Sequence, residues 1–453
     1  MKQSPKNLIY SNGALLRLVV PLMIELALQL VVGLLDSIMV SSVGESAVSG
    51  VSLVDSVMQL LIYIFSALAA GGAIVAGQFL GAGRKQDANR AAGELVWLNA
   101  LLSLGIMALM LALGDWLLAH LFGRIDAAVH FHARRYLFTV LFSIPAIGVY
   151  EACASIFRTM SDSKTTMKLS LMMNLINCAG NAALIYGCSM GARGAALSTV
   201  VSRWLAAALA VALLLNSRRE LHLQRTLRHR FDGSLTRKIL QMGVPNGVEN
   251  GIFQLGKILL LGLITTFGTS AITANAVSQT LSSLEVIPGS AIQLAMVSVI
   301  SHCAGAKDYE QVRYYNRKLI RLAYAAIAVW SALLLSSLPL LLSIYHLTAE
   351  TARLMLSLFL CHTLGAVLIG PMAFDLPAAL RASGDVRFTM VVSVTSMWVF
   401  RLGGAYLLSR ALGLGPLGVW ISMAFLDWGF RAVVYLARWR GGTWKTKGIL
   451  MDK

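Results

Sequence analysis

Nine carboxylates interrupt segments of this chain that are otherwise almost entirely apolar. An ionisable side chain at the centre of a bilayer costs about 2.5–3.5 kcal/mol on insertion scales, so an acid in a membrane-spanning segment indicates a binding or transport role. Four basic side chains in the same segments, Arg203, Lys257, Arg401 and Arg431, can neutralise only some of these acids. The nine acidic residues are Glu25, Asp36, Asp55, Glu94, Glu151, Glu249, Glu285, Asp375 and Asp427.

Asp36 differs from the other acids because no basic residue lies within two helical turns of it. At helical spacing, Glu25, Gln29, Gly33 and Asp36 form a polar stripe along one face of an apolar segment. A carboxylate in such a place must bind a proton, bind a cation or find a distant partner. The stripe therefore makes Asp36 the first candidate for an ion-binding group.

The remaining acids divide into structural and functional candidates. Asp427 precedes Arg431 by four residues, which is the spacing of an ion pair on a helix. Glu249 and Lys257 lie two turns apart on one face, close enough for a mutual interaction. Asp55 and Glu94 fall near the ends of predicted helices, where solvent can reach them.

The segments that hold these residues predict an all-α, polytopic membrane protein. The chain is 57% apolar and 13% charged, whereas ordinary globular domains are about 45–50% apolar and 25% charged. Crossing a bilayer takes about 20 apolar residues, and twelve stretches qualify. They are residues 14–40, 51–80, 91–113, 132–156, 165–188, 193–216, 237–266, 272–303, 319–344, 350–380, 387–410 and 416–438.

The second half of the chain repeats the first. Pro21-Leu-Met-Ile-Glu25 returns as Pro245-Asn-Gly-Val-Glu249, and Arg158-Thr-Met-Ser-Asp162 returns as Arg381-Ala-Ser-Gly-Asp385. A Gly-x-x-Gly step at Gly191 also returns at Gly415. The near-constant separation of 223 or 224 residues indicates duplication, and it also relates Glu151 to Asp375. We predict an amino-terminal lobe over residues 1–216, a polar loop over 217–236 and a carboxy-terminal lobe over 237–453. Six crossings per copy make the two copies parallel repeats.

The net charge of +17 reports membrane topology. Of the 38 Lys and Arg residues, 28 fall in the termini and in loops after even-numbered segments, and only six fall in loops after odd-numbered ones. The positive-inside rule then places both termini in the cytoplasm, as expected for a multi-pass protein of the inner (plasma) membrane. Anionic lipid is the expected partner of the basic loops, and nucleic acid is not.

The first segment is too long for a cleaved signal peptide, and the five cysteines show no spacing of a metal or disulfide framework.

Three motifs resemble the multidrug and toxic compound extrusion (MATE) family, of the bacterial DinF-like or NorM-like type. They are Leu34-Leu-Asp-Ser-Ile-Met-Val40, Val75-Ala-Gly-Gln-Phe-Leu-Gly-Ala-Gly-Arg84 and Leu380-Arg-Ala-Ser-Gly-Asp-Val-Arg-Phe388. The resemblance covers nearly the whole chain. It implies two six-helix lobes around a V-shaped cavity, and export of organic cations and drugs against inward flow of protons or sodium ions.

The resemblance also assigns candidate ion-binding residues. The acid of the first helix corresponds to Asp36, and the family's amino-lobe cation site adds positions that correspond to Asn177, Asn181 and Thr199. The family has an acid where this chain has Asn181, so one negative charge is missing from the expected site. Glu249 matches a Gly-x-Pro-x-x-x-Glu opening of the seventh helix, and it is the expected second coupling group.

The other acids match the family less closely. Asp375 lies off the usual position of the tenth-helix acid, which would fall near Gly370. Glu285 stands where the family is apolar and has no inherited role. We keep Asp375, Glu285, Glu151 and the stripe residues as candidates for binding the coupling ion or substrate.

The resulting hypothesis is a cation-coupled antiporter of organic cations that works by alternating access. It needs no cofactor beyond the coupling ion, which is H⁺ or Na⁺ held by Asp36, Asn177, Asn181 and Thr199. Pro21 removes a backbone hydrogen bond within the first helix, so bending there is the expected gating motion. A monomer is expected.

Three other functions are alternatives. A flippase for a lipid-linked oligosaccharide shares the wider architecture but handles an anionic pyrophosphate, so it requires Arg203, Lys257 and Arg401 to face the central cavity. A sugar or peptide carrier of the major facilitator type has a different loop after its second helix, where this chain has Gly81-Ala-Gly-Arg-Lys85. An enzyme is not expected, because the histidines form no catalytic constellation.

Overall fold

The computed structural model describes residues 8–121, 126–224, 229–345 and 347–451. Helices account for nearly all of them, and no strand occurs in these ranges. Within these ranges, twelve helical segments are long and apolar enough to cross a membrane, which confirms the predicted fold class and crossing number. Large apolar side chains point outward along them, such as Ile38, Ile258 and Val433, each at least 64% exposed. In a membrane protein such faces meet lipid.

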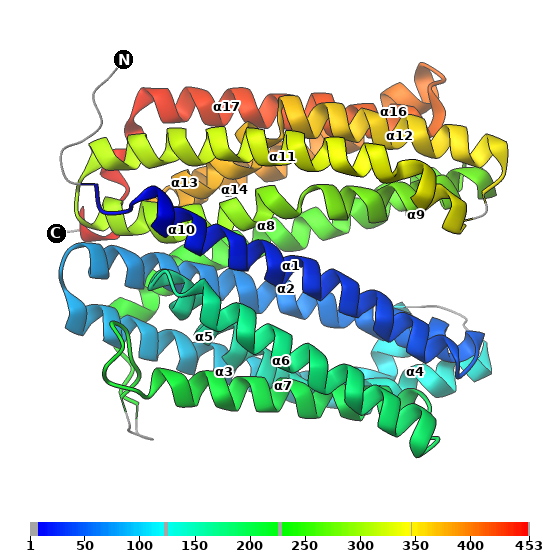
Figure 1. Cartoon of the computed structure of the whole chain (residues 1–453), viewed down its shortest axis with the longest axis horizontal. Coiled ribbons are helices and arrows are strands. Elements are labelled where there is room, and N and C mark those ends of the chain that lie inside the picture. Colours follow the sequence, from blue (N-terminus) through cyan, green and yellow to red (C-terminus); the bar gives the residue numbers. More distant parts are fainter. Residues whose placement is uncertain (1–7, 122–125, 225–228, 346, 452–453) are drawn as a thin grey trace. The chain divides into compact units, whose positions relative to one another are not determined.

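In the described part of the first repeat, seven helices form six crossings (Figure 1). One turn, Leu141–Ser143, joins α4 and α5 into a single crossing, and a wide π-helical turn, Ala182–Gly187, extends α6. The helices are α1 (Asn12–Ser41), α2 (Glu45–Gly81), α3 (Lys85–Leu121), α4 (Ala127–Val140), α5 (Ile144–Thr159), α6 (Ser163–Asn181) and α7 (Ala192–Leu214).

The second repeat is more often interrupted, and two of its interruptions adjoin prolines, which lack a backbone donor. α9 ends at Glu285 and α10 begins at Ile287, next to Pro288. π-helical turns occupy Pro371–Asp375, Ser396–Gly403, Leu407–Ala411 and Ser422–Asp427. The helices are α8 (Gly233–Thr265), α9 (Thr269–Glu285), α10 (Ile287–Gly305), α11 (Tyr309–Tyr345), α12 (Ala349–Leu368), α13 (Leu376–Ala382), α14 (Val386–Thr395), α15 (Gly404–Tyr406), α16 (Gly415–Ile421) and α17 (Trp428–Gly441).

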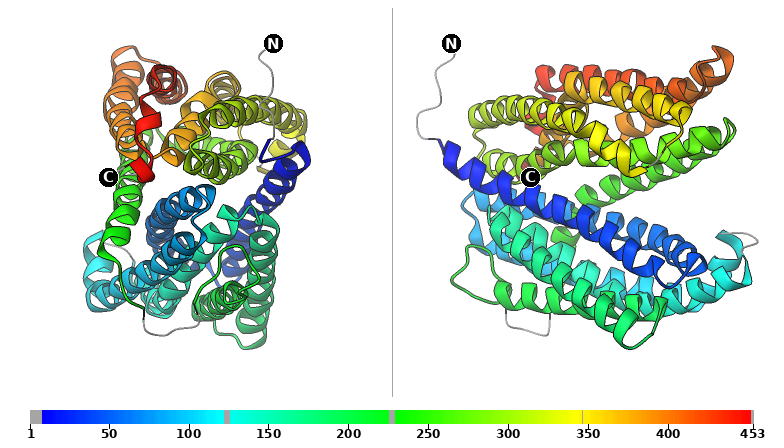
Figure 2. Two further views of the ribbon diagram at one scale, coloured as in Figure 1. Left: turned by 90° about the vertical axis from the view of Figure 1, so that its left-hand side faces the viewer. Right: turned by 45° about the vertical axis from the view of Figure 1, so that its right-hand side comes forward.

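Residue contacts divide the chain into two compact units. The N-unit is Val20–Gly247, and the C-unit joins the described residues up to Val19 with those from Val248 onward. The divisions fall beside Pro21 in α1 and Pro245 in α8, so each of these two helices contributes to both units. The views in Figure 2 follow the same helices from two other directions.

Each unit has its own apolar core. In the N-unit, α2, α4 and α5 enclose Met58, Phe65 and Leu137, all at most 2% exposed. In the C-unit, α9, α12 and α16 enclose Ala274, Phe359 and Trp420. Close helix packing in these cores fixes the positions of the polar side chains described below.

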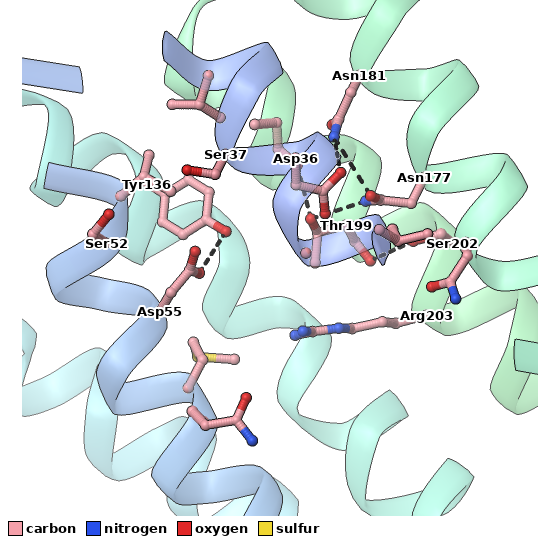
Figure 3. Close-up of a pocket in the computed structure, with 18 of the residues that line it drawn as sticks. Asp36, Ser37, Ser52, Asp55, Tyr136, Asn177, Asn181, Thr199, Ser202 and Arg203 are labelled. Carbon is pink, nitrogen blue, oxygen red and sulfur yellow. Dashed lines mark hydrogen bonds between the residues drawn. The ribbon is translucent and has the colours of Figure 1, made fainter. Parts of the chain in front are cut away.

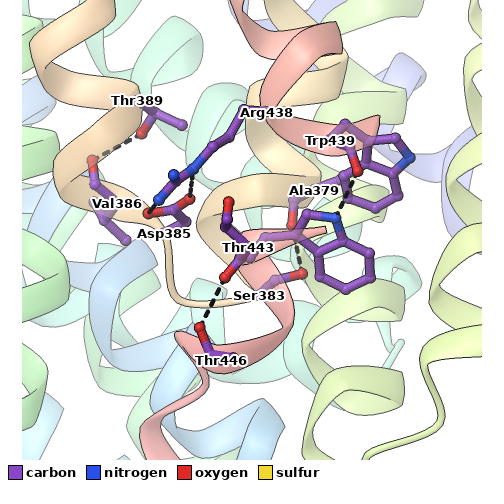
Figure 4. Close-up of polar contacts among 10 residues, drawn as sticks. Ala379, Ser383, Asp385, Val386, Thr389, Arg438, Trp439, Thr443 and Thr446 are labelled. Carbon is purple, nitrogen blue, oxygen red and sulfur yellow. Dashed lines mark hydrogen bonds and ion pairs between the residues drawn. The ribbon is translucent and has the colours of Figure 1, made fainter. Parts of the chain in front are cut away.

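A short carboxy-terminal segment closes against the turn after α13 (Figure 4). Arg438 on α17 donates to both oxygens of Asp385 at 2.7 and 3.2 Å, and the Trp444 indole donates to the Trp439 carbonyl at 3.0 Å. Gly384, in that turn, has φ +101°, and a Cβ there would lie 2.1 Å from the Lys447 carbonyl oxygen. The turn therefore needs glycine for its conformation and for space.

We predict that Gly384→Ala lowers the unfolding midpoint more than Gly413→Ala does. Gly413 also has positive φ, at +70°, but nothing lies within 4 Å of its Cβ position. Both variants carry the ~1–2 kcal/mol cost of the left-handed region, and only Gly384→Ala adds a clash of about 1–3 kcal/mol. Thermal-shift measurements in detergent compare them, and equal midpoints would contradict the packing described here.

Candidate functional site

Asp36 lies in a polar cavity of about 440 Å³ inside the N-unit. We call this space the N-cavity; its lining includes Gln29, Asp36, Asp55, Asn177, Thr199 and Arg203. Figure 3 shows that α1, α2, α6 and α7 turn polar side chains toward it. Three residues of the polar stripe predicted on the first helix, Gln29, Gly33 and Asp36, therefore line the N-cavity.

Amide groups hold the Asp36 carboxylate. Asn181 donates from Nδ2 to Oδ1 of Asp36 at 2.8 Å. In the amide orientation that satisfies both of its polar atoms, Asn177 donates to the two Asp36 oxygens at 2.9 and 3.0 Å and accepts from the Thr199 hydroxyl at 3.1 Å. The structure thus brings together the four residues expected at a cation site: Asp36, Asn177, Asn181 and Thr199.

No ion pair with Asp36 occurs within the described ranges. Arg203 lines the same cavity, but its Nη1 donates to Ser143 at 2.9 Å. The second acid in the cavity, Asp55, accepts from the Tyr136 hydroxyl at 2.8 Å. Two carboxylates and one guanidinium give the N-cavity a net charge of −1 when all are ionised, and this matches one monovalent cation.

The sequence interpretation gave Asp55 and Tyr136 no place in the site. A signal existed for Asp55, because Ser52, Asp55, Ser56 and Gln59 form a second polar stripe at helical spacing, and all four line the N-cavity. Tyr136 carried no such signal, since only the tertiary fold brings α4 beside α2.

Glu25 lies outside the N-cavity and belongs to a buried ion network. Arg158 Nη1 lies 3.7 Å from Glu25, and Arg158 Nη2 lies 4.0 Å from Glu151. Thr166 donates to Glu25 at 2.7 Å. Glu25 is only 4% exposed, so the guanidinium provides the countercharge that its burial requires.

The same pairing recurs in the second repeat. Arg381 Nη1 lies 3.5 Å from Glu249, so Glu249 corresponds to Glu25 and Arg381 to Arg158. The interaction considered between Glu249 and Lys257 is not formed as an ion pair within 4.0 Å. The two motifs that the sequence repeats, Pro-x-x-x-Glu and Arg-x-x-x-Asp, therefore contact each other in each half of the chain.

The other second-repeat acids are buried in different settings. Glu285 is fully buried and accepts from Ser331 at 2.6 Å, and it lies 2.6 Å from Nδ1 of His362. Asp375, 2% exposed, ends a π-helical turn and lines a cavity of about 280 Å³ in the C-unit. Asp375 therefore reaches a cavity, whereas Glu285 is held by its neighbours.

Two expectations for individual acids were wrong. Asp427 pairs with Arg401 at 3.5 Å and accepts from Ser396 at 2.6 Å, and Arg431 lies over the Phe374 ring at 4.8 Å instead. Asp427 ends a π-helical turn that packs against the segment bearing Arg401, and the four-residue rule assumes a regular, isolated helix.

Glu94 was expected near solvent, but it is 1% exposed. α3 begins at Lys85, six residues before the predicted start, so Glu94 lies well inside the helix. It contacts His229 at 2.6 Å and accepts from the Thr236 hydroxyl. Both partners lie in the segment predicted as the inter-lobe loop, whose last residues, from Gly233, already belong to α8.

A family model described as MatE matches residues 21–183 and again residues 245–407. The two matches are offset by 224 residues, which agrees with the duplication in the sequence. An uncharacterized transporter, YisQ, from Bacillus subtilis is 27% identical over 95% of this chain and 94% of its own length. A probable multidrug resistance protein, NorM, from Thermotoga maritima is 25% identical over 96% and 94%.

Solved structures share the fold. The outward-facing conformation of a multidrug resistance MATE family transporter superposes with TM-score 0.88 at 21% identity, covering 96% of each chain. A transporter of the MOP superfamily from Pyrococcus furiosus, described with a binding pocket of reverse polarity, gives TM-score 0.87 at 21% identity over 95% and 96%.

We predict that Arg158→Met destabilises the N-unit more than the double variant Arg158→Met/Glu25→Met. The single change leaves the Glu25 carboxylate buried without its guanidinium, which costs about 3–5 kcal/mol. The double variant avoids that loss and keeps only the loss of the longer contact between Arg158 and Glu151, at 4.0 Å. Thermal unfolding of wild type, both single variants and the double variant gives the coupling energy. Additive losses would show that the two side chains do not interact.

Proposed function

Because this chain belongs to the MatE family, we propose that it exports small organic cations, including drugs, in exchange for inward movement of H⁺ or Na⁺. The observation that carries the proposal is the setting of Asp36. This carboxylate lies within a membrane-spanning helix, lines the N-cavity and forms no ion pair with any described residue.

The N-cavity suits exchange of one positive charge for another. Its net charge of −1 is balanced by a single proton, sodium ion or organic cation. Two occupants that need the same carboxylate compete for it. A ligand shifts a conformational equilibrium only through different affinities for the two states, so competition at Asp36 couples the movements if the inward-open and outward-open states differ in affinity for the two cations.

The membrane potential can supply the driving force. It contributes ~2.3 kcal/mol for each elementary charge at 100 mV. Export therefore proceeds uphill when one more positive charge enters than leaves. The ion pairs Glu25–Arg158 and Glu249–Arg381 are structural in this scheme, because each glutamate already has a guanidinium beside it.

A flippase for an anionic lipid-linked precursor is the second candidate. It is favoured by the three membrane cations Arg203, Lys257 and Arg401, each of which lines a cavity inside its own unit. The curated relatives named as multidrug resistance proteins favour the first candidate, as does the negative charge of the N-cavity.

We predict that Asp36→Asn abolishes gradient-driven ethidium accumulation in proteoliposomes, because the neutral amide cannot exchange cations. The measurement uses a proton gradient alone and a sodium gradient alone, which also identifies the coupling ion. Asp115→Asn is the matched control: Asp115 is exposed and pairs with Arg134 at 2.6 Å. Undiminished accumulation by Asp36→Asn would exclude Asp36 from the mechanism.

We predict that Asn181→Asp makes the protein's stability specifically dependent on sodium. The new carboxylate would lie beside Asp36, and two like charges at this distance need a shared cation. Sodium binding then raises the unfolding midpoint by about 2–4 °C for each kcal/mol that it adds to the free energy of unfolding. Thermal shifts in NaCl and in choline chloride at equal ionic strength measure the effect. Asn174→Asp adds the same charge to the cavity without replacing an Asp36 partner, and an equal sodium effect in that control would contradict the prediction.

A further inference from the structure

The C-unit contains a cavity whose charge is opposite to that of the N-cavity. It measures about 280 Å³ and lies among α8, α9, α10, α12 and the π-helical turns of the second repeat. A neighbouring space of about 190 Å³ shares Lys257, Gln279, Arg401 and Met423 with it. We call the two together the C-cavity.

The two basic side chains of the C-cavity lie at the same aromatic ring. Lys257 Nζ is 5.4 Å from the centroid of Phe253, and Arg401 Cζ is 4.9 Å from it. Cations over a ring face gain modest attraction, which does not replace a countercharge. Two positive charges therefore converge on one side of the cavity.

Neither cation has its bonding capacity filled by the residues described. Arg401 is only 5% exposed; its Nη1 lies 3.5 Å from Asp427 and its Nη2 donates to the Met423 sulfur, but its Nε has no hydrogen-bond partner. A buried unmade donor costs about 1–3 kcal/mol, and more when it is charged. Lys257 contacts the ring of Phe253, and no carboxylate of a described residue lies within ion-pair distance of it.

The acids near the C-cavity do not neutralise both of its positive charges. Asp427 serves Arg401 and Ser396, and Glu285 is held by Ser331 and His362. Asp375 lines the larger space but forms no ion pair within 4.0 Å with Lys257 or Arg401. A negatively charged group on a ligand would supply the missing countercharge for Lys257 and Arg401.

The rest of the lining fits a small ligand with an apolar ring. Phe253, Phe374, Ile327 and Trp428 provide apolar surface, and Gln279 and Gln293 provide polar groups. Carboxylates accept paired hydrogen bonds from guanidinium groups, and aromatic rings pack against one another. A cavity of about 280 Å³ is just below the range for drug-sized ligands.

We propose that the C-cavity binds a small aromatic carboxylate, with its carboxylate between Lys257 and Arg401 and its ring against Phe253 and Trp428. This site goes beyond the proposed export of organic cations, which depends on the N-cavity. It gives the protein a second binding site, of opposite charge preference, in the other half of the duplication.

Isothermal titration calorimetry of the purified protein in detergent tests the site, with benzoate as the probe. Benzoate is expected to bind, whereas neutral benzamide and inorganic phosphate bind at least tenfold more weakly, because each lacks either the charge or the ring. Lys257→Met is expected to weaken benzoate binding about tenfold or more, and Lys257→Arg to retain it. Lys257 is the residue to change because its removal leaves no carboxylate unpaired.

Lys168→Met, at an exposed position on α6, controls for loss of one positive charge from the protein and should leave benzoate binding unchanged. Equal binding of benzoate and benzamide, tighter binding of phosphate than of benzoate, or unchanged benzoate binding by Lys257→Met would each overturn the proposal. Ethidium export is a separate readout, so its failure bears on the proposed function and not on this site.

Discussion

The cost of placing a carboxylate in a low-dielectric membrane segment organises this protein. Arginine side chains form ion pairs with Glu25, Glu249 and Asp427 and so offset that cost. Glu285 contacts a histidine and a serine instead. Among the described residues, neutral amides beside a cavity hold Asp36. Its charge is therefore available to a mobile cation, as the proposed antiport requires.

Duplication explains both the symmetry of the structure and the departures from it. Each repeat pairs its Pro-x-x-x-Glu motif with its Arg-x-x-x-Asp motif, so the Glu–Arg contacts are a shared structural element. The cavities have diverged: Asp36 and Asp55 lie in one, and Lys257 and Arg401 lie in the other. With Arg203 and Asp375 included, the charged lining residues sum to −1 in the N-cavity and to +1 in the C-cavity.

Features that depend on local periodicity were predictable from the sequence. Apolar length located the twelve crossings, and helical spacing identified the stripe that leads to Asp36. Features that depend on distant contacts were not. The Arg401 partner of Asp427 lies on another segment, brought there by π-helical turns, and Glu94 is buried by His229 and Thr236, which are more than 130 residues away in sequence. The roles of the Asp36 group, the cytoplasmic termini and bending at Pro21 stay predictions.

The most direct test of the central claim counts the cations that leave Asp36 when an organic cation binds. Ethidium is titrated into purified protein in buffers of different protonation enthalpy, with and without sodium, while proton and sodium release are recorded. The account predicts that about one cation leaves per ethidium bound to wild type, and that none leaves from Asp36→Asn. Equal release from both proteins, or binding with no release from either, would contradict it.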